Sequence, residues 1–237
     1  MFAGSSPSGR GALAAPSTAG PDVFAAIPFL FFGLMALVVA GIVWGVLRNS
    51  RRIKALHAHA AQCGWWPITA DQPMPGPVAH AARSRRTRLA VATTRGQPMW
   101  LIWHRWTESS GVGDDRTSST HDLTRYFLLL GPGYEDVEVV KRTAIGGLFM
   151  PVRGVGTGDA DFDKRFLIRG PGEHQAVRLL TPPIRAAMLA GHAPAWAVSA
   201  GVLISAYSVP PSVETLEPRA NALVVLSRML TGPTAGG

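Results

Sequence analysis

One uninterrupted apolar run near the N-terminus dominates the hydropathy pattern. The segment VFAAIPFLFFGLMALVVAGIVWGVL, from Val23 to Leu47, has no charged residue over 25 positions. At about 1.5 Å per residue, such a helix extends about 37 Å, which exceeds the hydrocarbon core of about 30 Å. Backbone groups must be paired inside lipid, so a spanning segment is helical. The pattern predicts a transmembrane helix at 23–47 and a protein that crosses the bilayer once.

A cleavable signal peptide is the main alternative for this run. Signal peptides place basic residues before a short apolar region close to the terminus. Residues 1–22 carry only Arg10 and Asp22 as charges, and the apolar run that follows is long, which favours an uncleaved anchor. The Gly, Ser, Pro and Ala content of residues 1–22 predicts a disordered tail.

Basic residues crowd the C-terminal flank of the run and indicate its direction. By the positive-inside rule, they predict a cell-membrane protein with the N-terminus outside and the C-terminal domain cytoplasmic. They would contact anionic lipid headgroups at the membrane surface. The reverse topology, with an extracytoplasmic tethered domain, remains the alternative. The residues concerned are Arg48, Arg51, Arg52 and Lys54.

Small residues at helical spacing lie inside the apolar run. Gly41 and Gly45 form a G-x-x-x-G pair, and Ala36 with Ala40 repeats the spacing. Such pairs let two helices approach closely in lipid. A homodimer through this helix is therefore one predicted arrangement.

Beyond the run, RRIKALHAHAAQCG consists largely of good helix formers and ends at Gly64. It predicts a basic juxtamembrane helix at 48–64, which either continues or restarts the membrane helix. The remaining residues, 65–237, suit one soluble α+β domain with a single core.

Short β-rich runs separated by Gly and Pro turns follow Trp65. They are WWPIT, TRLAVATT, PMWLIWHRW, TRYFLLL and DVEVVK, and they predict an antiparallel meander. Alternation puts Trp100 and Trp106 on one face of their strand and Trp103 on the other, which indicates a strand covered on both sides. The polar, glycine-rich stretch from Glu108 to Asp122 predicts a long mobile loop, which is the best candidate for a functional loop and equally for a loop without a function.

The second half mixes strands and helices. FLIR after the acidic DADFD is a predicted strand, residues 173–180 and 182–191 are predicted helices, and AWAVSAG and VLISAYS are strands that meet at Gly201. A C-terminal helix from Thr215 to Leu230 would bury one face. The fold class predicted is α+β, with a mainly antiparallel sheet and packed helices. That face holds Leu216, Ala220, Leu223, Leu226 or Val224, and Leu230.

This order of pieces resembles a family of uncharacterised single-pass membrane proteins of actinobacteria. The matching features are the helix ending at Gly64–Trp65, DFDKRF at 161–166, LLTPPIRAAML from Leu179, the hairpin around Gly201 and the final helix. They cover most of residues 51–231. The resemblance implies architecture and a membrane location, and it implies no reaction.

The net charge indicates which classes of partner the protein could bind, and the cysteine content indicates whether it could form a disulfide. The net charge of +8 favours anionic partners, with lipid headgroups ahead of nucleic acid. The arginines at 83, 85, 86, 88 and 95 are interpreted as a lipid-facing patch, so nucleic acid is not an expected partner. Cys63 is the only cysteine, which excludes an intrachain disulfide, and it is interpreted as a packed thiol.

Catalytic and metal motifs are weak throughout. Asp159, Asp161 and Asp163 alternate as in a calcium loop, but Lys164 and Gly170 stand where that loop needs glycine and glutamate. A solvated strand entry is the preferred interpretation of this stretch. The seven histidines are scattered, no G-x-S-x-G occurs, and the glycines of RGVGTGD lack the lysine of a phosphate loop. The sequence therefore predicts no catalytic, metal or cofactor site.

Two hypotheses for function remain. The first is a membrane-tethered binding or scaffolding domain that holds a protein partner. The second is an enzyme whose site is assembled from dispersed residues, such as Asp114, Asp115 or His121 with Arg125 or His104.

Overall fold

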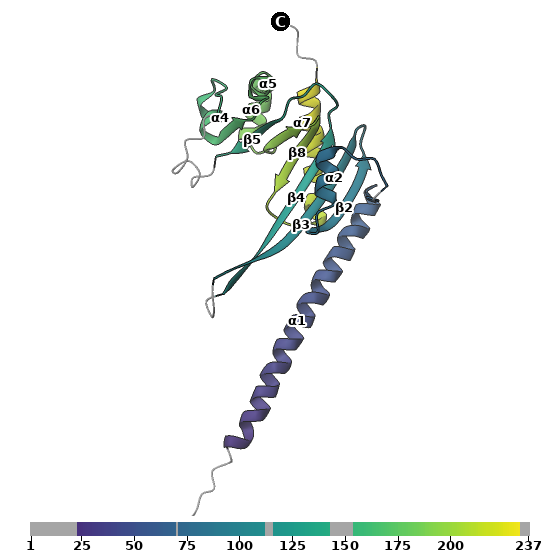
Figure 1. The fold of residues 1–237 in the computed structure, drawn as a ribbon, viewed down its shortest axis with the longest axis vertical. Coiled ribbons are helices and arrows are strands. Elements are labelled where there is room, and N and C mark those ends of the chain that lie inside the picture. The colour runs from purple at the N-terminus through teal and green to yellow at the C-terminus, as the bar shows by residue number, and fades with distance from the viewer. Residues whose placement is uncertain (1–22, 70, 112–115, 143–153, 233–237) are drawn as a thin grey trace, which may run out of the picture. The chain divides into compact units, whose positions relative to one another are not determined.

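The computed structural model describes residues 23–69, 71–111, 116–142 and 154–232. The chain divides into two units, residues 1–52 and 53–237. One helix, α1 (Val23–Gln62), begins in the first unit and ends in the second (Figure 1). From Phe31 onward it has a mean hydropathy of 2.1 in its most apolar stretch, and no side chain of that stretch is buried. One helix that is long and apolar enough to cross a membrane is therefore present, and it continues without a break through the basic segment.

The last turns of α1 belong to the core of the second unit. Leu56 is 3% exposed and Ala60 is 1% exposed, and Trp65, just beyond the helix, is 2% exposed. Gly64 ends this stretch with a φ of +79°, a conformation that glycine adopts without strain. The compact domain thus starts at Ile53, earlier than the predicted boundary at residue 65.

The domain is built on one antiparallel sheet of eight strands in the order β1-β2-β3-β4-β8-β7-β5-β6. The first four form the predicted meander, but β5 does not follow β4. The β7–β8 hairpin lies between them because β8 pairs with β4 and β7 pairs with β5. The strands are β1 (Trp66–Pro67), β2 (Thr87–Thr94), β3 (Pro98–Ser110), β4 (Thr117–Leu129), β5 (Val137–Lys141), β6 (Phe166–Arg169), β7 (Trp196–Ser199) and β8 (Val202–Tyr207).

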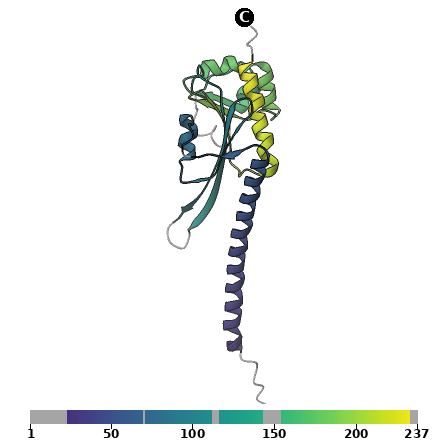
Figure 2. The same cartoon turned by 90° about the vertical axis from the view of Figure 1, so that its right-hand side faces the viewer.

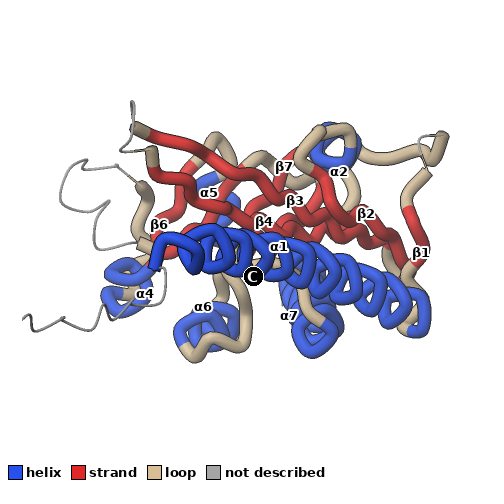
Figure 3. The backbone as a smooth tube through the Cα atoms, turned by 90° about the horizontal axis from the view of Figure 1, so that it is seen from below, coloured by secondary structure: helices blue, strands red, loops and turns tan. Residues whose placement is uncertain are grey.

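Helices lie on both sides of this sheet. In Figure 2 the sheet separates α2 from the yellow α7, and Figure 3 shows α4, α6 and α7 together on the side away from α2. Buried residues of α4, α5, α6 and α7 join one large apolar cluster, while α2 contributes Val78 and Ala81 to a smaller one. The helices are α2 (Gly76–Ala82), α4 (Ala160–Arg165), α5 (Glu173–Leu179), α6 (Pro182–Leu189) and α7 (Val213–Thr231).

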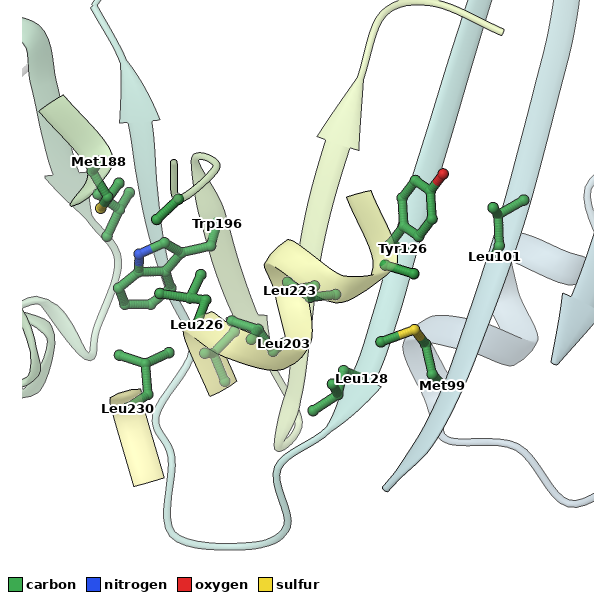
Figure 4. Close-up of a cluster of buried hydrophobic side chains, with 14 of the residues drawn as sticks. Met99, Leu101, Tyr126, Leu128, Met188, Trp196, Leu203, Leu223, Leu226 and Leu230 are labelled. Carbon is green, nitrogen blue, oxygen red and sulfur yellow. The ribbon is translucent and has the colours of Figure 1, made fainter. Parts of the chain in front are cut away.

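The larger cluster is closed by α7. This helix buries the predicted face, with Leu226 rather than Val224 inside the core. Leu223 and Leu226 lie among side chains of the sheet and of α6 (Figure 4). The helix begins at Val213, two residues before the expected start at Thr215, so Pro218 falls in its second turn. The fold class is therefore α+β as predicted, with its C-terminal helix packed on the sheet.

Two stretches differ from their predicted structure. The acidic DADFD is not a strand entry but the helix α4, because the Asp159 side chain accepts a hydrogen bond from Phe162 N at 3.2 Å and caps the first turn. The expected loop from Glu108 to Asp122 is mostly strand. Its residues extend β3 and β4 into a two-stranded ribbon, because Thr and Ser side chains pair across it, as Thr107 does with Thr120 at 3.3 Å.

Candidate functional site

The side of the sheet that carries α2 is only partly covered. The helix contacts β2 and β3, and its neighbours Trp100 and Phe127 are 6% and 1% exposed. Further along the sheet, the side chains of β8, β7 and β5 on this side are half-buried or exposed, except for Val202, which is buried. On the opposite side of these strands, Trp196, Val198 and Leu203 are buried. We call this partly covered surface the open face.

A groove runs along the open face because small side chains lie between large ones. Strand register places Phe127, Ile204, Ala197 and Glu138 in one row across β4, β8, β7 and β5. Ala206 lies beside this row on β8 and is exposed. The alanines leave a hollow between α2 on one side and the Glu138 side chain on the other.

Two adjoining cavities make up this groove, which we call the sheet groove. They have volumes of about 420 and 380 Å³ and share Glu138, Ala197, Ser199 and Ile204. The first reaches Pro77 and His80 of α2, and the second reaches Gly170 beyond β6. An elongated, mainly apolar hollow with a few charged groups has the composition of a binding site.

Arg125 is the notable charged group of the sheet groove. It lies on β4 opposite Ala206 of β8 and is half-buried. Burial lowers its pKa from the usual value, and no nearby carboxylate offsets this. Its guanidinium has no hydrogen bond or ion pair to any residue in the described part of the chain. A cation held partly out of water without a partner is unfavourable, which suggests an anionic group from elsewhere.

The far rim of the groove is already charge-paired. Arg169 Nε donates to Glu138 Oε2 at 2.6 Å, between β6 and β5. At the end of the groove, Asp136 accepts hydrogen bonds from the Ala200 amide at 2.8 Å and from the Ser199 hydroxyl at 3.1 Å. Glu138 therefore does not neutralise Arg125, which lies three strands away.

His104 lies next to Arg125 on the same side of the sheet but is closed off by α2. It is 6% exposed, and its Nε2 donates to the carbonyl of Ala81 at 2.9 Å. Burial lowers the pKa of His104, and the charges of Arg125 and Arg86 lower it further, against the effect of the Ala81 bond. His104 is therefore a neutral structural group beneath α2 and not an accessible base.

The base of the ribbon brings together His121, Trp106 and Glu108. The His121 ring stacks on Trp106 with 5.4 Å between ring centroids, and the Arg86 guanidinium lies 5.1 Å from the Trp106 centroid. Ser119 Oγ is 3.0 Å from His121 Nε2, and Glu108 is 3.6 Å from the same nitrogen. A catalytic triad needs the hydroxyl and the carboxylate on different ring nitrogens, so this contact set is not one.

The remaining predicted site residues are dispersed. Arg48, Arg51, Arg52 and Lys54 are exposed on α1, and Gly41 and Gly45 are exposed with no atom within 4 Å of an added Cβ. Asp114 and Asp115 lie outside the described residues. Where the structure describes the chain, no group of three or more His, Cys, Asp or Glu side chains could hold a metal ion. Asp159 is occupied by the α4 cap and by Arg185 at 3.1 Å, and Asp163 accepts from Thr157.

Cys63 lies at the end of α1, half-buried, with its Sγ 3.6 Å from His59 Nε2. Burial and the Glu217 carboxylate raise the pKa of the thiol. A raised pKa leaves less thiolate, so Cys63 is a poor nucleophile.

Sequence reasoning named Arg125 but missed the groove around it. The sequence analysis did not predict the helix α2, although the two prolines of its PGPVAHAAR segment are a signal for the start of a helix. Without α2, the half-covered side of the sheet could not be recognised. No protein family, curated protein or solved structure matches this chain.

Proposed function

We propose that this chain is a membrane-tethered binding or scaffolding protein. In this proposal α1 spans the cell membrane, the domain lies in the cytoplasm, and the sheet groove docks a protein partner close to the inner leaflet. The main support for this proposal is the open face. There Ile204, Ala197 and Ala206 leave apolar surface accessible beside the part of the sheet that α2 covers. Exposed apolar hollows on a soluble surface mark interaction sites.

The basic end of the apolar helix supports the orientation and the lipid contact. Arg48, Arg51, Arg52 and Lys54 all have exposed side chains, so each can reach anionic headgroups. Each basic residue near an anionic leaflet contributes about 1 kcal/mol of attraction. Nucleic acid is not part of the proposal, because aromatic side chains such as Trp100 and Trp103 are buried and cannot stack on bases.

Site-directed photo-crosslinking tests the docking surface. A photoreactive phenylalanine at Ala206, in the groove, should yield an adduct with one defined protein in native membranes. The same residue at Val225, which is 54% exposed on α7, is the matched control and should not. The Ala206 adduct should disappear when Ile204→Glu is added. Equal adducts from both positions, or none from Ala206, would overturn the proposal.

A reporter fusion tests the orientation independently. Alkaline phosphatase attached to the C-terminus should be inactive in cells, because the enzyme folds only outside the cytoplasm. A cytoplasmic fluorescent reporter at the same position should be bright. An active phosphatase fusion would place the domain on the other side and remove the inner leaflet from the proposal.

A further inference from the structure

We infer that the sheet groove takes one amphipathic helix of the protein partner, lying beside α2, with an aspartate or glutamate of that helix placed against Arg125. The inference rests on the proposed function and names the chemistry of its partner. It follows from the size of the groove, its apolar floor and the unmatched charge at one end.

The width of the open face suits one helix. Strands in a sheet lie about 4.8 Å apart, so β3 and β8 are separated by about 10 Å, which is a usual distance between packed helices. Since α2 contacts β2 and β3, a second helix beside it would lie over β8. Between β4 and β5, whose Glu138 forms the far rim, about 14 Å is available, more than the helix diameter of about 10–12 Å.

The length of the groove favours a peptide segment over a compact small molecule. The two adjoining cavities follow β8 from Ala206 toward Ser199 at the hairpin end. The strand from Val202 to Ala206 spans about 13 Å, which equals about nine residues of helix. The half-buried Ala197 and the exposed Ala206 would let the backbone of an incoming helix approach the sheet closely.

Charge decides which residue type the helix must carry. Arg125 has no carboxylate partner in the described part of the chain, and the cavity that it lines contains one acidic side chain, Glu138, at the opposite rim. Glu138, the acid at the opposite rim, is bound to Arg169. A guanidinium binds a carboxylate with two parallel hydrogen bonds, so an Asp or Glu side chain is the complementary group. In the apolar groove this contact would exclude water and fix the register of the helix.

Peptide selection on the full-length protein in lipid nanodiscs tests the inference. The probes are helical peptides of about 16 residues from a displayed random library, long enough to exceed the groove. They are selected on the wild type and counter-selected on Ala206→Trp, which fills the groove. Selected peptides should carry an acidic residue within an apolar stripe. Changing that residue from Glu to Gln should weaken binding about tenfold or more on the wild type.

The charge contact is then isolated with variants of the groove. On Arg125→Met the Glu and Gln peptides should bind within about twofold of each other, because the complementary charge is gone. Arg169→Met is the matched control, since it removes a paired arginine at the rim, and the preference for Glu should persist there. Thermal unfolding of each variant shows whether it is folded before binding is compared.

The outcomes separate this inference from the function on which it rests. The inference is wrong if the groove-specific peptides carry no acidic residue. It is also wrong if Arg125→Met prefers the Glu peptide over the Gln peptide as strongly as the wild type does. A selection that yields no groove-specific peptide overturns it as well. If the cross-link from Ala206 depends on Ile204 but is unchanged by Arg125→Met, the groove docks a partner without this contact, and only the inference fails. If no peptide is selected, 4-phenylbutanoate serves as a small carboxylate probe. A shift of the Ile204 methyl NMR signal on its addition would show that the groove binds a small carboxylate, which also contradicts a helix as the occupant.

Discussion

Trp65 donates a hydrogen bond of 2.8 Å from its indole Nε1 to Oε1 of Glu217, although 152 positions separate the two residues. The other carboxylate oxygen of Glu217 is bound by Arg95, whose second nitrogen donates to Asn221 at 2.8 Å. Arg95 also lies over the Trp65 ring, 5.7 Å from its centroid. One carboxylate thus joins the chain just after α1, the β2–β3 turn and α7.

Replacing Glu217 should therefore destabilise the domain, and the loss should depend on which contacts the new residue keeps. Glu217→Gln keeps an acceptor for Trp65 but removes the charge that Arg95 binds, whereas Glu217→Ala removes both. The glutamate side chain is 25% exposed, so solvent weakens the ion pair. We expect losses in the free energy of unfolding of about 0.5–1 kcal/mol for Gln and about 1–3 kcal/mol for Ala. Denaturant unfolding followed by tryptophan fluorescence measures both, and equal losses would contradict this account.

Arg125→Met should leave the domain as stable as the wild type or stabilise it by up to about 1 kcal/mol. The substitution removes an ionised group that is held partly out of water without a partner in the described part of the chain. Arg185→Met is the contrasting variant, because Arg185 bonds the Asp159 carboxylate at 3.1 Å and the Leu180 carbonyl at 2.8 Å. It should cost about 1–3 kcal/mol. Thermal unfolding in the same detergent compares the two, and a loss on Arg125→Met would show that this side chain has a structural partner.

His104 should make the domain less stable as the pH falls. Burial lowers its pKa in the folded state below the usual 6.5, so the unfolded chain binds a proton more readily. The contribution is fully present above the unfolded pKa and is lost as the pH falls below about 6.5, toward the lower folded value.

The matched variant for this prediction is His104→Gln, whose amide can still donate to the Ala81 carbonyl. Between about pH 7.5 and pH 5.5, the wild type should lose more of its free energy of unfolding than this variant does. The excess is about 1.4 kcal/mol for each tenfold difference in proton affinity between the folded and unfolded states. Denaturant titrations at the two pH values provide the comparison. Parallel pH profiles would show that His104 does not titrate differently in the folded state.

The glycine pair of α1 provides a test of self-association. Gly41→Ile should lower energy transfer between fluorescent C-terminal fusions in membranes, because a large side chain prevents close approach of two helices. Gly33→Ile lies on the same apolar helix outside the G-x-x-x-G pair and is the control. Both positions have free space around an added Cβ, so neither change disturbs the domain. Equal energy transfer in both variants would contradict dimerisation through Gly41 and Gly45.

Much of the fold could be predicted from local patterns. The apolar run, the alternation around Trp100 and Trp103, the hairpin glycine at 201 and the face of α7 each follow from periodicity or turn chemistry. The position of β5 could not be predicted in this way. It depends on β8 taking the edge of β4, a pairing between residues about 80 positions apart that no local signal encodes.

The groove illustrates the same limit for the site. Arg125 alternates with the buried Thr124 and Tyr126, so its side of β4 could be assigned from the strand pattern. The openness of that side could not, because within the described residues it depends on α2 lying over β2 and β3 while most side chains of β8, β7 and β5 stay half-buried or exposed. Its small residues, Ala197 and Ala206, resemble ordinary strand residues in the sequence.

The burial of Leu56 and Ala60 has a consequence for biosynthesis. These residues are synthesised before the sheet, whereas α7, which packs against the same core and holds Trp65 through Glu217, is synthesised after it. The first and last parts of the domain must therefore meet before its core is sealed. Until α7 has emerged from the ribosome, the side of the sheet that it covers is an exposed apolar surface and is prone to aggregation.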